Sequence, residues 1–210
     1  MIGRMSLLFL TIAALLPIAN PFATAALFMS LTQGDSSQER AHTARWTCIY
    51  MFAILAFFLI AGTLVMRFFG ISEAGIRIAG GLIILVVGFR MLFPTESPIS
   101  AKEQSEALNK KDIALVPLAL PSLSGPGSIA VVLSIAADTT GLMDHLFVLS
   151  GILVVALFSY AVLLGASRLT KYLGVGGINA FSRIMGFFLI CIAVQFLAKG
   201  IHEFILHPDF

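Results

Sequence analysis

Charged residues are scarce in this sequence of 210 residues. Only 11% are Asp, Glu, Lys or Arg, whereas 59% are hydrophobic, and the mean hydropathy is +0.99. A soluble domain contains about 45–50% apolar and about 25% charged residues. The composition therefore excludes a soluble domain and predicts an all-α polytopic membrane protein. The formal net charge of +2 is close to balance, so nothing indicates nucleic acid as a partner.

Groups that carry chemistry are also few. Cys48 and Cys191 both lie inside apolar runs without metal-ligand spacing, so we interpret them as packed thiols. No Asp, Glu, His or Lys lies in the middle of an expected span. This argues against paired catalytic aspartates, a metal centre and a carboxylate proton relay. We expect neither an enzyme nor a bound cofactor.

Six apolar segments are long enough to cross a bilayer, since a spanning helix needs about 20 mostly apolar residues. They cover roughly residues 5–31, 46–69, 74–93, 113–137, 145–167 and 178–200, and residues 173–177 form a flexible connection before the last one. Arg77, Arg90 and Arg183 fall near span ends. We expect these long side chains to reach the headgroup region.

The first apolar run has an alternative interpretation. Arg4, the apolar stretch and Ala23-Thr24-Ala25 also fit a cleaved signal peptide. We favour a retained helix, because the run carries no charge from Met5 to Gly34, which is long for a signal.

The two halves of the chain repeat a pattern. Arg77-Ile78-Ala79-Gly80 recurs as Arg183-Ile184-Met185-Gly186, an offset of 106 (183 minus 77), and Pro21 recurs as Pro126, an offset of 105. Three spans per half is an odd number, so homologous halves must have opposite orientations, as in inverted-topology repeats. We expect a first repeat in residues 1–93, a hydrophilic cytoplasmic linker in 94–112 and the inverted repeat in 113–210.

Positive charge divides unevenly between the loops. Of the 13 Lys and Arg residues, nine fall on the side of the first, third and fifth loops and four on the side of the termini. Because Lys and Arg are enriched on the cytoplasmic side, both termini are expected outside.

Each half contains one apolar segment interrupted by proline and glycine, at Asn20-Pro21 and at Gly125-Pro126-Gly127. Proline removes a backbone donor and glycine permits unusual dihedrals. In hydrocarbon, such a break persists only where it is buried or lines a polar cavity. We therefore predict a midplane cavity in which half-helix N-termini attract a carboxylate and unwound carbonyls attract an ammonium group. A zwitterion such as a small amino acid meets both requirements.

The candidate substrate-binding residues surround these breaks. They are Asn20, Pro21 and Thr24 in the first span and Ser122, Ser124, Gly125, Pro126, Gly127 and Ser128 in the fourth. The alternative is that the breaks serve only close helix packing and that the hydroxyls bond to their own helices. Gln195 could line the cavity or bond between helices. Glu73 and Arg77, four residues apart, could form an interfacial ion pair or an outer gate.

The interrupted stretches resemble the MarC family of membrane proteins. The similar motifs are Leu16–Pro21, Phe69–Ser72, Arg77–Gly81, Val116–Pro121, Ser124–Gly127 and Ser182–Gly186, and the resemblance runs from about residue 5 to residue 200. It implies a bacterial or archaeal inner-membrane protein of six helices. Some members are described as transporters of small neutral amino acids driven by an ion gradient. Others, including the MarC branch that this chain most resembles, have no established activity. By motif, the resemblance places the site at Asn20, Pro21, Gly125, Pro126 and Gly127.

We therefore expect an inner-membrane secondary transporter or exporter for a small neutral amino acid or similar zwitterion, with alternating access around the midplane. A proton or sodium ion is the candidate coupling ion, and the expected partners are the solute, the lipid bilayer and a possible homodimer. A non-transporting scaffold or regulatory protein and a drug-efflux protein are the alternatives. An enzyme acting on lipid-linked substrates would have to use loop groups, of which Asp35, Glu39, His42 and Asp138 are the candidates.

Overall fold

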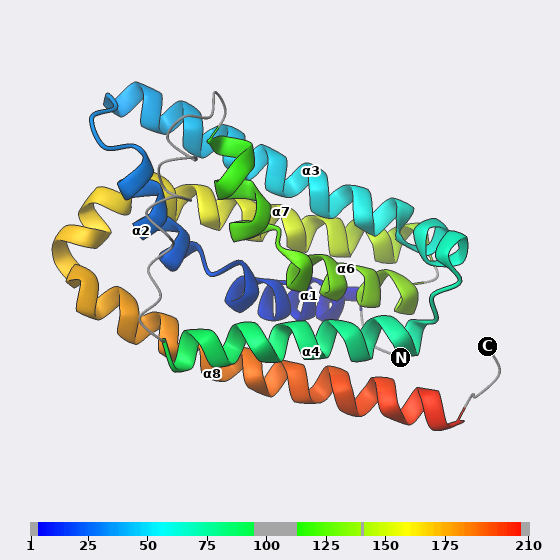
Figure 1. The fold of residues 1–210 in the computed structure, drawn as a ribbon. Coiled ribbons are helices and arrows are strands. Elements are labelled where there is room, and N and C mark those ends of the chain that lie inside the picture. The colour runs from blue at the N-terminus through cyan, green and yellow to red at the C-terminus, as the bar shows by residue number, and fades with distance from the viewer. Residues whose placement is uncertain (1–3, 95–112, 140, 207–210) are drawn as a thin grey trace.

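The computed structural model describes residues 4–94, 113–139 and 141–206, and all regular secondary structure in these ranges is helical (Figure 1). The helices are α1 (Arg4–Ala19), α2 (Pro21–Leu31), α3 (Ser37–Phe69), α4 (Glu73–Leu92), η1 (Ala114–Leu123), α6 (Pro126–Asp138), α7 (Leu142–Leu164) and α8 (Ala166–Leu206). The prediction of an all-α polytopic membrane protein is confirmed.

Within the described residues, four helices are each long and apolar enough to cross a membrane: α3, α4, α7 and the Gly176–Leu206 part of α8. Two bent pairs also qualify, α1 with α2 at 41° and η1 with α6 at 61°. If each bent pair is one span, the total is six, in the expected order. The inverted relation between the halves stays a prediction, and residues 95–112 of the expected linker lie outside the described residues.

The expected connection at residues 173–177 coincides with a break inside α8, and its flexibility stays a prediction. The long helix is interrupted at Gly174, whose backbone has φ 63° and ψ 179°. Glycine adopts this conformation readily because it has no Cβ. The break turns α8 back on itself, so that its longer part runs along α4 (Figure 1).

Local sequence explains the short connection between α3 and α4. Gly70 ends α3 in the left-handed conformation, at φ 63°. Two residues later, the Ser72 hydroxyl accepts a hydrogen bond from the Gly75 amide at 3.1 Å and caps α4. The chain therefore passes from α3 to α4 in three residues, and α6 packs against both helices.

Small residues let α4 and α8 approach closely along their length. A Cβ built on Gly81 would lie 3.1 Å from the Ala193 carbonyl oxygen, and one on Gly88 would lie 3.0 Å from that of Gly186. The residues are seven apart on each helix and run in opposite directions, so they form one antiparallel seam. Such small-residue contacts permit close backbone packing between membrane helices.

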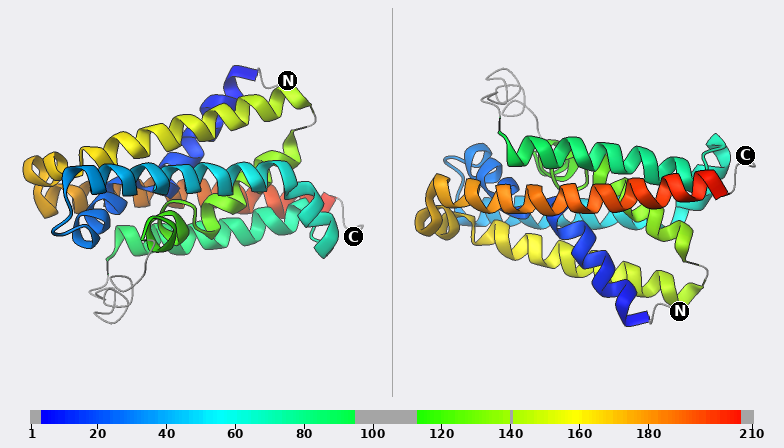
Figure 2. Two further views of the ribbon diagram at one scale, coloured as in Figure 1. Left: turned by 90° about the horizontal axis from the view of Figure 1, so that it is seen from above. Right: turned by 90° about the horizontal axis from the view of Figure 1, so that it is seen from below.

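At one end, the bundle splays apart. Figure 2 shows α1 and α7 diverging from α4 and α8 toward the end where both chain termini lie. The buried core lies farther in, where Leu15, Met51, Leu118, Val131 and Ile152 have at most 1% exposure. The cavities described below lie at this splayed end of the bundle.

Candidate substrate site and access cavity

Asn20 forms the break in the first span. Its backbone is left-handed, with φ 37° and ψ 65°, and its side-chain oxygen accepts a hydrogen bond from the Ala23 amide at 3.4 Å. Asparagine tolerates this conformation better than most residues and is a favoured N-cap, while proline suits the first helical position. Asn20-Pro21 therefore ends α1 and begins α2 with the new helix start capped.

The second break is built differently. Val116 and Leu120 have non-helical dihedrals inside η1, because a residue that precedes proline disfavours the helical region. Gly125 then precedes α6 in an extended conformation, and α6 has no side-chain cap. A Cβ on Gly125 would lie 2.6 Å from the Pro121 carbonyl oxygen, so this position requires glycine.

The structure brings the two breaks together. The hydroxyls of Thr24 and Ser122 lie 2.7 Å apart, which joins residues 98 positions apart in the sequence. Gly127 packs against α1, since a Cβ there would lie 3.3 Å from the Ile18 Cγ2. We call the meeting point of Asn20–Thr24 with Ser122–Ser128 the crossing; it contains all nine predicted substrate-binding residues, whose binding role stays a prediction.

One polar group at the crossing lacks a partner. Ser128 donates from its hydroxyl to the Leu123 carbonyl at 3.1 Å, but the fully buried Ser124 hydroxyl has no hydrogen-bond partner. A buried polar group without a partner is uncommon and calls for an explanation. Ser124 directly precedes the uncapped N-terminus of α6, so the two unsatisfied features are neighbours.

Two adjoining cavities lie at the end of the bundle that carries the termini, at residues other than the nine predicted ones. The inner cavity measures about 160 Å³ and the outer one about 530 Å³. Both are lined by Leu10, Arg77, Ile135, Asp138 and Lys199. We call them together the vestibule. Gln195 lines the inner cavity, which is not the midplane cavity that was predicted for it at the two breaks.

Arg77 occupies the wall of the vestibule and is only 3% exposed. Its Nε donates to the Ser134 hydroxyl at 3.1 Å, and its terminal nitrogens form ion pairs with Asp138 of α6 and Glu203 of α8. The expectation that the Arg77 side chain reaches the headgroups is wrong. Its ion-pair partners are Asp138 and Glu203 in place of the predicted Glu73. A buried charge requires such partners, and here two neighbouring helices supply them.

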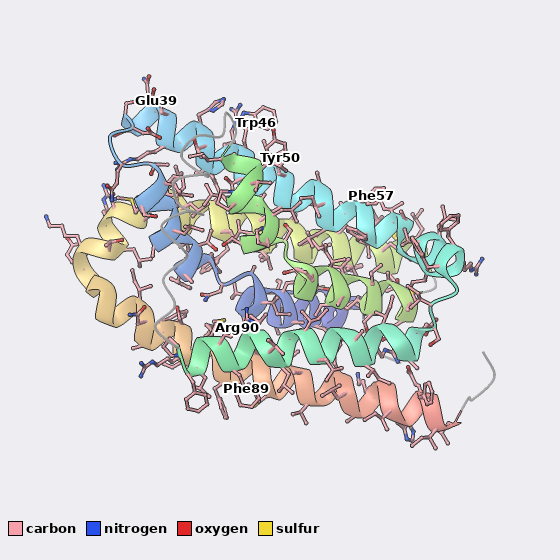
Figure 3. The ribbon with its side chains drawn as sticks, viewed as in Figure 1. Glu39, Trp46, Tyr50, Phe57, Phe89 and Arg90 are labelled. Atoms are coloured by element: carbon pink, nitrogen blue, oxygen red, sulfur yellow. The ribbon has the colours of Figure 1, made fainter. Side chains whose placement is uncertain are left out.

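Close helix packing explains why Arg77 turns inward. A Cβ on Gly80 would lie 2.7 Å from that of Ala130, so α4 presses against α6 one turn away from Arg77. The far end of α4 differs: Arg90 is exposed there, as expected for an arginine near a span end (Figure 3). No signal in the sequence paired Arg77 with Glu203.

The four candidate enzyme groups do not come together. Asp35, Glu39 and His42 lie at the start of α3, whereas Asp138 ends α6, which packs against α3 at Gly62, about 30 Å farther along that helix at 1.5 Å per residue. Glu39 caps α3 with Ser36, and His42 accepts a hydrogen bond from Trp46 Nε1 at 3.1 Å. In the part of the chain that is described, no group of three or more His, Cys, Asp or Glu residues could hold a metal ion.

The Ser36 hydroxyl and backbone amide hydrogen-bond to Glu39 and lower the pKa of its carboxyl group. The side chain is exposed at the start of α3 (Figure 3), and its role is that of a helix cap.

Four apolar helices that could each span a membrane, and two bent helix pairs that meet inside the bundle, define an integral membrane protein built around broken helices. The family model described as MarC family integral membrane protein matches residues 5–205. The chain belongs to this family.

Curated relatives extend this similarity over almost the full length. The chain is 43% identical over 208 residues to the UPF0056 inner membrane protein MarC of Escherichia coli (strain UTI89 / UPEC). It is 42% identical to the proteins of the same name from Escherichia coli (strain K12) and Shigella flexneri. Each alignment covers 93% of this chain and 94% of the relative. No solved structure matches.

Proposed function

We propose that the protein is an inner-membrane secondary transporter or exporter for a small zwitterion, such as a small neutral amino acid. The observation that carries this proposal is a charged vestibule that leads toward a buried crossing of two broken helices. Ala14 lines the inner cavity six residues before Asn20, and Ser134 lines it eight residues after Pro126. At 1.5 Å per helical residue, the crossing lies about 9–12 Å deeper.

The crossing offers chemistry for a carboxylate. The N-terminus of α6 has no side-chain cap, so its first amides and the positive end of the helix dipole face an unsatisfied position. The buried Ser124 hydroxyl beside it lacks a partner. A carboxylate at this point would satisfy both.

The same region suits an ammonium group. The non-helical residues Val116 and Leu120 interrupt the hydrogen-bond ladder of η1, and carbonyls released in this way are good acceptors for a cation. The Thr24 and Ser122 hydroxyls add two further polar atoms between the halves. A solute with both charges a few ångströms apart fits this arrangement without any ionised side chain.

Alternating access follows from the arrangement of the two ends. The vestibule is accessible at the end of the termini, while the crossing is closed by the Thr24–Ser122 bond and by Gly127 against Ile18. Transport requires a second arrangement that closes the vestibule and opens the other end, with a proton or sodium ion as the coupling ion. The relatives are named inner membrane proteins, and the distribution of Lys and Arg supports an orientation with both termini outside.

Uptake and counterflow of radiolabelled glycine, alanine and serine into proteoliposomes tests this function. We expect saturable flux that depends on a proton or sodium gradient. Ser124→Ala should reduce the flux, whereas Ser150→Ala should not, because the Ser150 hydroxyl bonds to the Phe147 carbonyl of its own helix. Flux equal to that of empty vesicles for all three solutes contradicts the proposal.

A scaffold or regulatory protein whose breaks serve only packing is the alternative from a different class. Labelling of Asn20→Cys with a hydrophilic maleimide separates the two. A transporter that opens toward the crossing exposes this thiol and substrate slows the labelling; a packed kink protects it in every condition. The inner cavity, at about 160 Å³, also favours a small solute over the large hydrophobic molecules of drug efflux.

A further inference from the structure

We infer that the vestibule is a second binding site for the zwitterion, distinct from the crossing. Arg77 and Lys199 bind the carboxylate, and Asp138 and Glu203 bind the ammonium group. The identity of the solute rests on the proposed function. The site itself is argued from the cavity and its charged groups.

The inner cavity has the composition of a small-molecule site. Most of its wall is apolar and comes from α1, α6 and α8: Leu10, Ala13, Ala14, Ile135, Ile192 and Phe196. The polar lining residues are Arg77 of α4, Ser134 and Asp138 of α6, and Gln195 and Lys199 of α8. A cavity of about 160 Å³ holds several waters or one small solute. Apolar walls with a few convergent polar groups are typical of ligand pockets.

Arg77 has donors available for a ligand. A guanidinium group carries five N–H donors, and Ser134, Asp138 and Glu203 each accept from a different nitrogen of Arg77. Two N–H groups are therefore left over. The three acceptors from α6 and α8 hold the guanidinium in place before a ligand arrives, which reduces the ordering cost of binding. The planar group can then bind a carboxylate, with the Lys199 ammonium on the same cavity wall.

The vestibule also requires a positive group on its ligand. Its wall carries three carboxylates, Asp138, Asp144 and Glu203, against two cations, Arg77 and Lys199, with His202 counted as neutral. A simple anion would add to an existing negative excess, whereas a zwitterion adds no net charge.

Two acceptors suit the ligand's ammonium group. The Asp138 side chain is 57% exposed, so one of its faces is open to the cavity. The Glu203 Oε2 is buried and has no hydrogen-bond partner. An ammonium group supplies the donors that both oxygens can accept.

Equilibrium binding of radiolabelled alanine to the purified full chain in nanodiscs tests the site. Lys199→Met removes one charge from the vestibule, and Lys171→Met is the matched control, since Lys171 is exposed at the other end of α8. Ala13→Leu fills the inner cavity, and Ala79→Leu is its control on an exposed position of α4. Because the crossing also binds alanine, the wild type should bind two equivalents; we expect Lys199→Met and Ala13→Leu to weaken one of the two at least tenfold and to leave the other, and each control to change both less than twofold.

Competition adds a test of the ligand's two charges. Glycine should displace bound alanine, whereas glycinamide, which lacks the carboxylate, and N-acetylglycine, which lacks the ammonium, should not. Displacement by N-acetylglycine as strong as that by glycine would overturn the assignment of the ammonium group to Asp138 and Glu203.

The outcomes separate this inference from the proposed function. Wild-type flux together with unchanged binding in both Lys199→Met and Ala13→Leu overturns the vestibule site and leaves the transporter standing. Alanine binding that depends on Lys199 and Ala13 without flux supports the site and contradicts transport. Absence of both binding and flux overturns both. The two variants act by charge and by volume, so misfolding of one leaves the other as the test.

Discussion

Each of the two breaks has a proline at the start of a new helix, but the helix starts differ in how their polar groups are hydrogen-bonded. In the first span, Asn20 takes a left-handed conformation and its side chain caps α2. In the fourth, Gly125 is extended, α6 has no side-chain cap and the neighbouring Ser124 hydroxyl has no partner. The polar groups at the first break are hydrogen-bonded by residues of the break itself, whereas those at the second break are not. A repeated sequence feature thus produces one structural break and one that is suited to a ligand.

The largest effect is expected where the two breaks touch. Gly127→Leu places a side chain against Ile18, with a Cβ only 3.3 Å from its Cγ2. Overpacking of this kind costs about 1–3 kcal/mol, and we expect flux to fall to background because the crossing can no longer admit a solute. Proteoliposome flux and thermal unfolding measure both effects.

Gly176→Leu is the matched control for Gly127→Leu, because nothing lies within 4 Å of a Cβ at that position. It should leave flux and unfolding near wild type. An active Gly127→Leu protein would show that the crossing is not on the solute pathway.

Single substitutions at the two break residues sharpen the comparison. Gly125→Ala should be strongly destabilising, because its Cβ would meet the Pro121 carbonyl oxygen at 2.6 Å. Asn20→Ala loses a cap and strains a left-handed residue, each of which costs about 1–2 kcal/mol, whereas Asn20→Gly keeps the conformation and loses little. Unfolding midpoints of the three variants in one detergent should rank Asn20→Gly above Asn20→Ala. Equal midpoints for these two would show that the left-handed backbone carries no strain.

Ser124→Ala tests whether the hydroxyl is kept for a ligand. Removal of a buried hydroxyl without a partner should leave stability unchanged or raise it, while flux falls about tenfold, since about 1.4 kcal/mol of ligand hydrogen bonding is lost. Ser122→Ala breaks the bond to Thr24 and should instead lower stability by about 0.5–1.5 kcal/mol. A large loss of stability in Ser124→Ala would indicate a structural role for this residue.

The smallest effect is expected at α3, whose capped start contrasts with that of α6. Ser36 lowers the pKa of the Glu39 carboxyl in the folded protein. Glu39 therefore contributes stability above its unfolded-state pKa, and this contribution is lost as pH falls through the lower folded-state pKa. Because the side chain is exposed, the effect is small. Unfolding midpoints at neutral and acidic pH should show a slightly weaker acid dependence in Glu39→Gln and a smaller reduction in Ser36→Ala, which keeps the backbone amide that donates to Glu39. An unchanged acid dependence in both variants would remove this role for the pair.

Much of the fold was predictable because bilayer thickness and proline chemistry act locally. The six spans, the two breaks and the candidate residues around them follow from run length and from Asn20-Pro21 and Gly125-Pro126. The connection before the last span was also placed correctly, because Gly174 forms the break there, although the residues around it remain helical.

The charged vestibule was not predicted from the sequence. An arginine near a span end was expected to reach the headgroups, but Arg77 is buried and pairs with the more exposed Asp138 and Glu203, 61 and 126 residues away (138 minus 77; 203 minus 77). Such pairing depends on the register between α4, α6 and α8, which the glycine contacts along these helices set. Local patterns carry no information about that register.

The sequence by itself determined that the chain is a membrane protein with two interrupted spans, because hydrophobic run length and the missing proline donor act within each segment. Only the tertiary structure decided that the breaks meet through Thr24 and Ser122, that Ser124 is left without a partner, and that Arg77 lines a charged vestibule. These features arise from how the helices cross and how closely their small residues let them approach, and both are properties of the packed bundle.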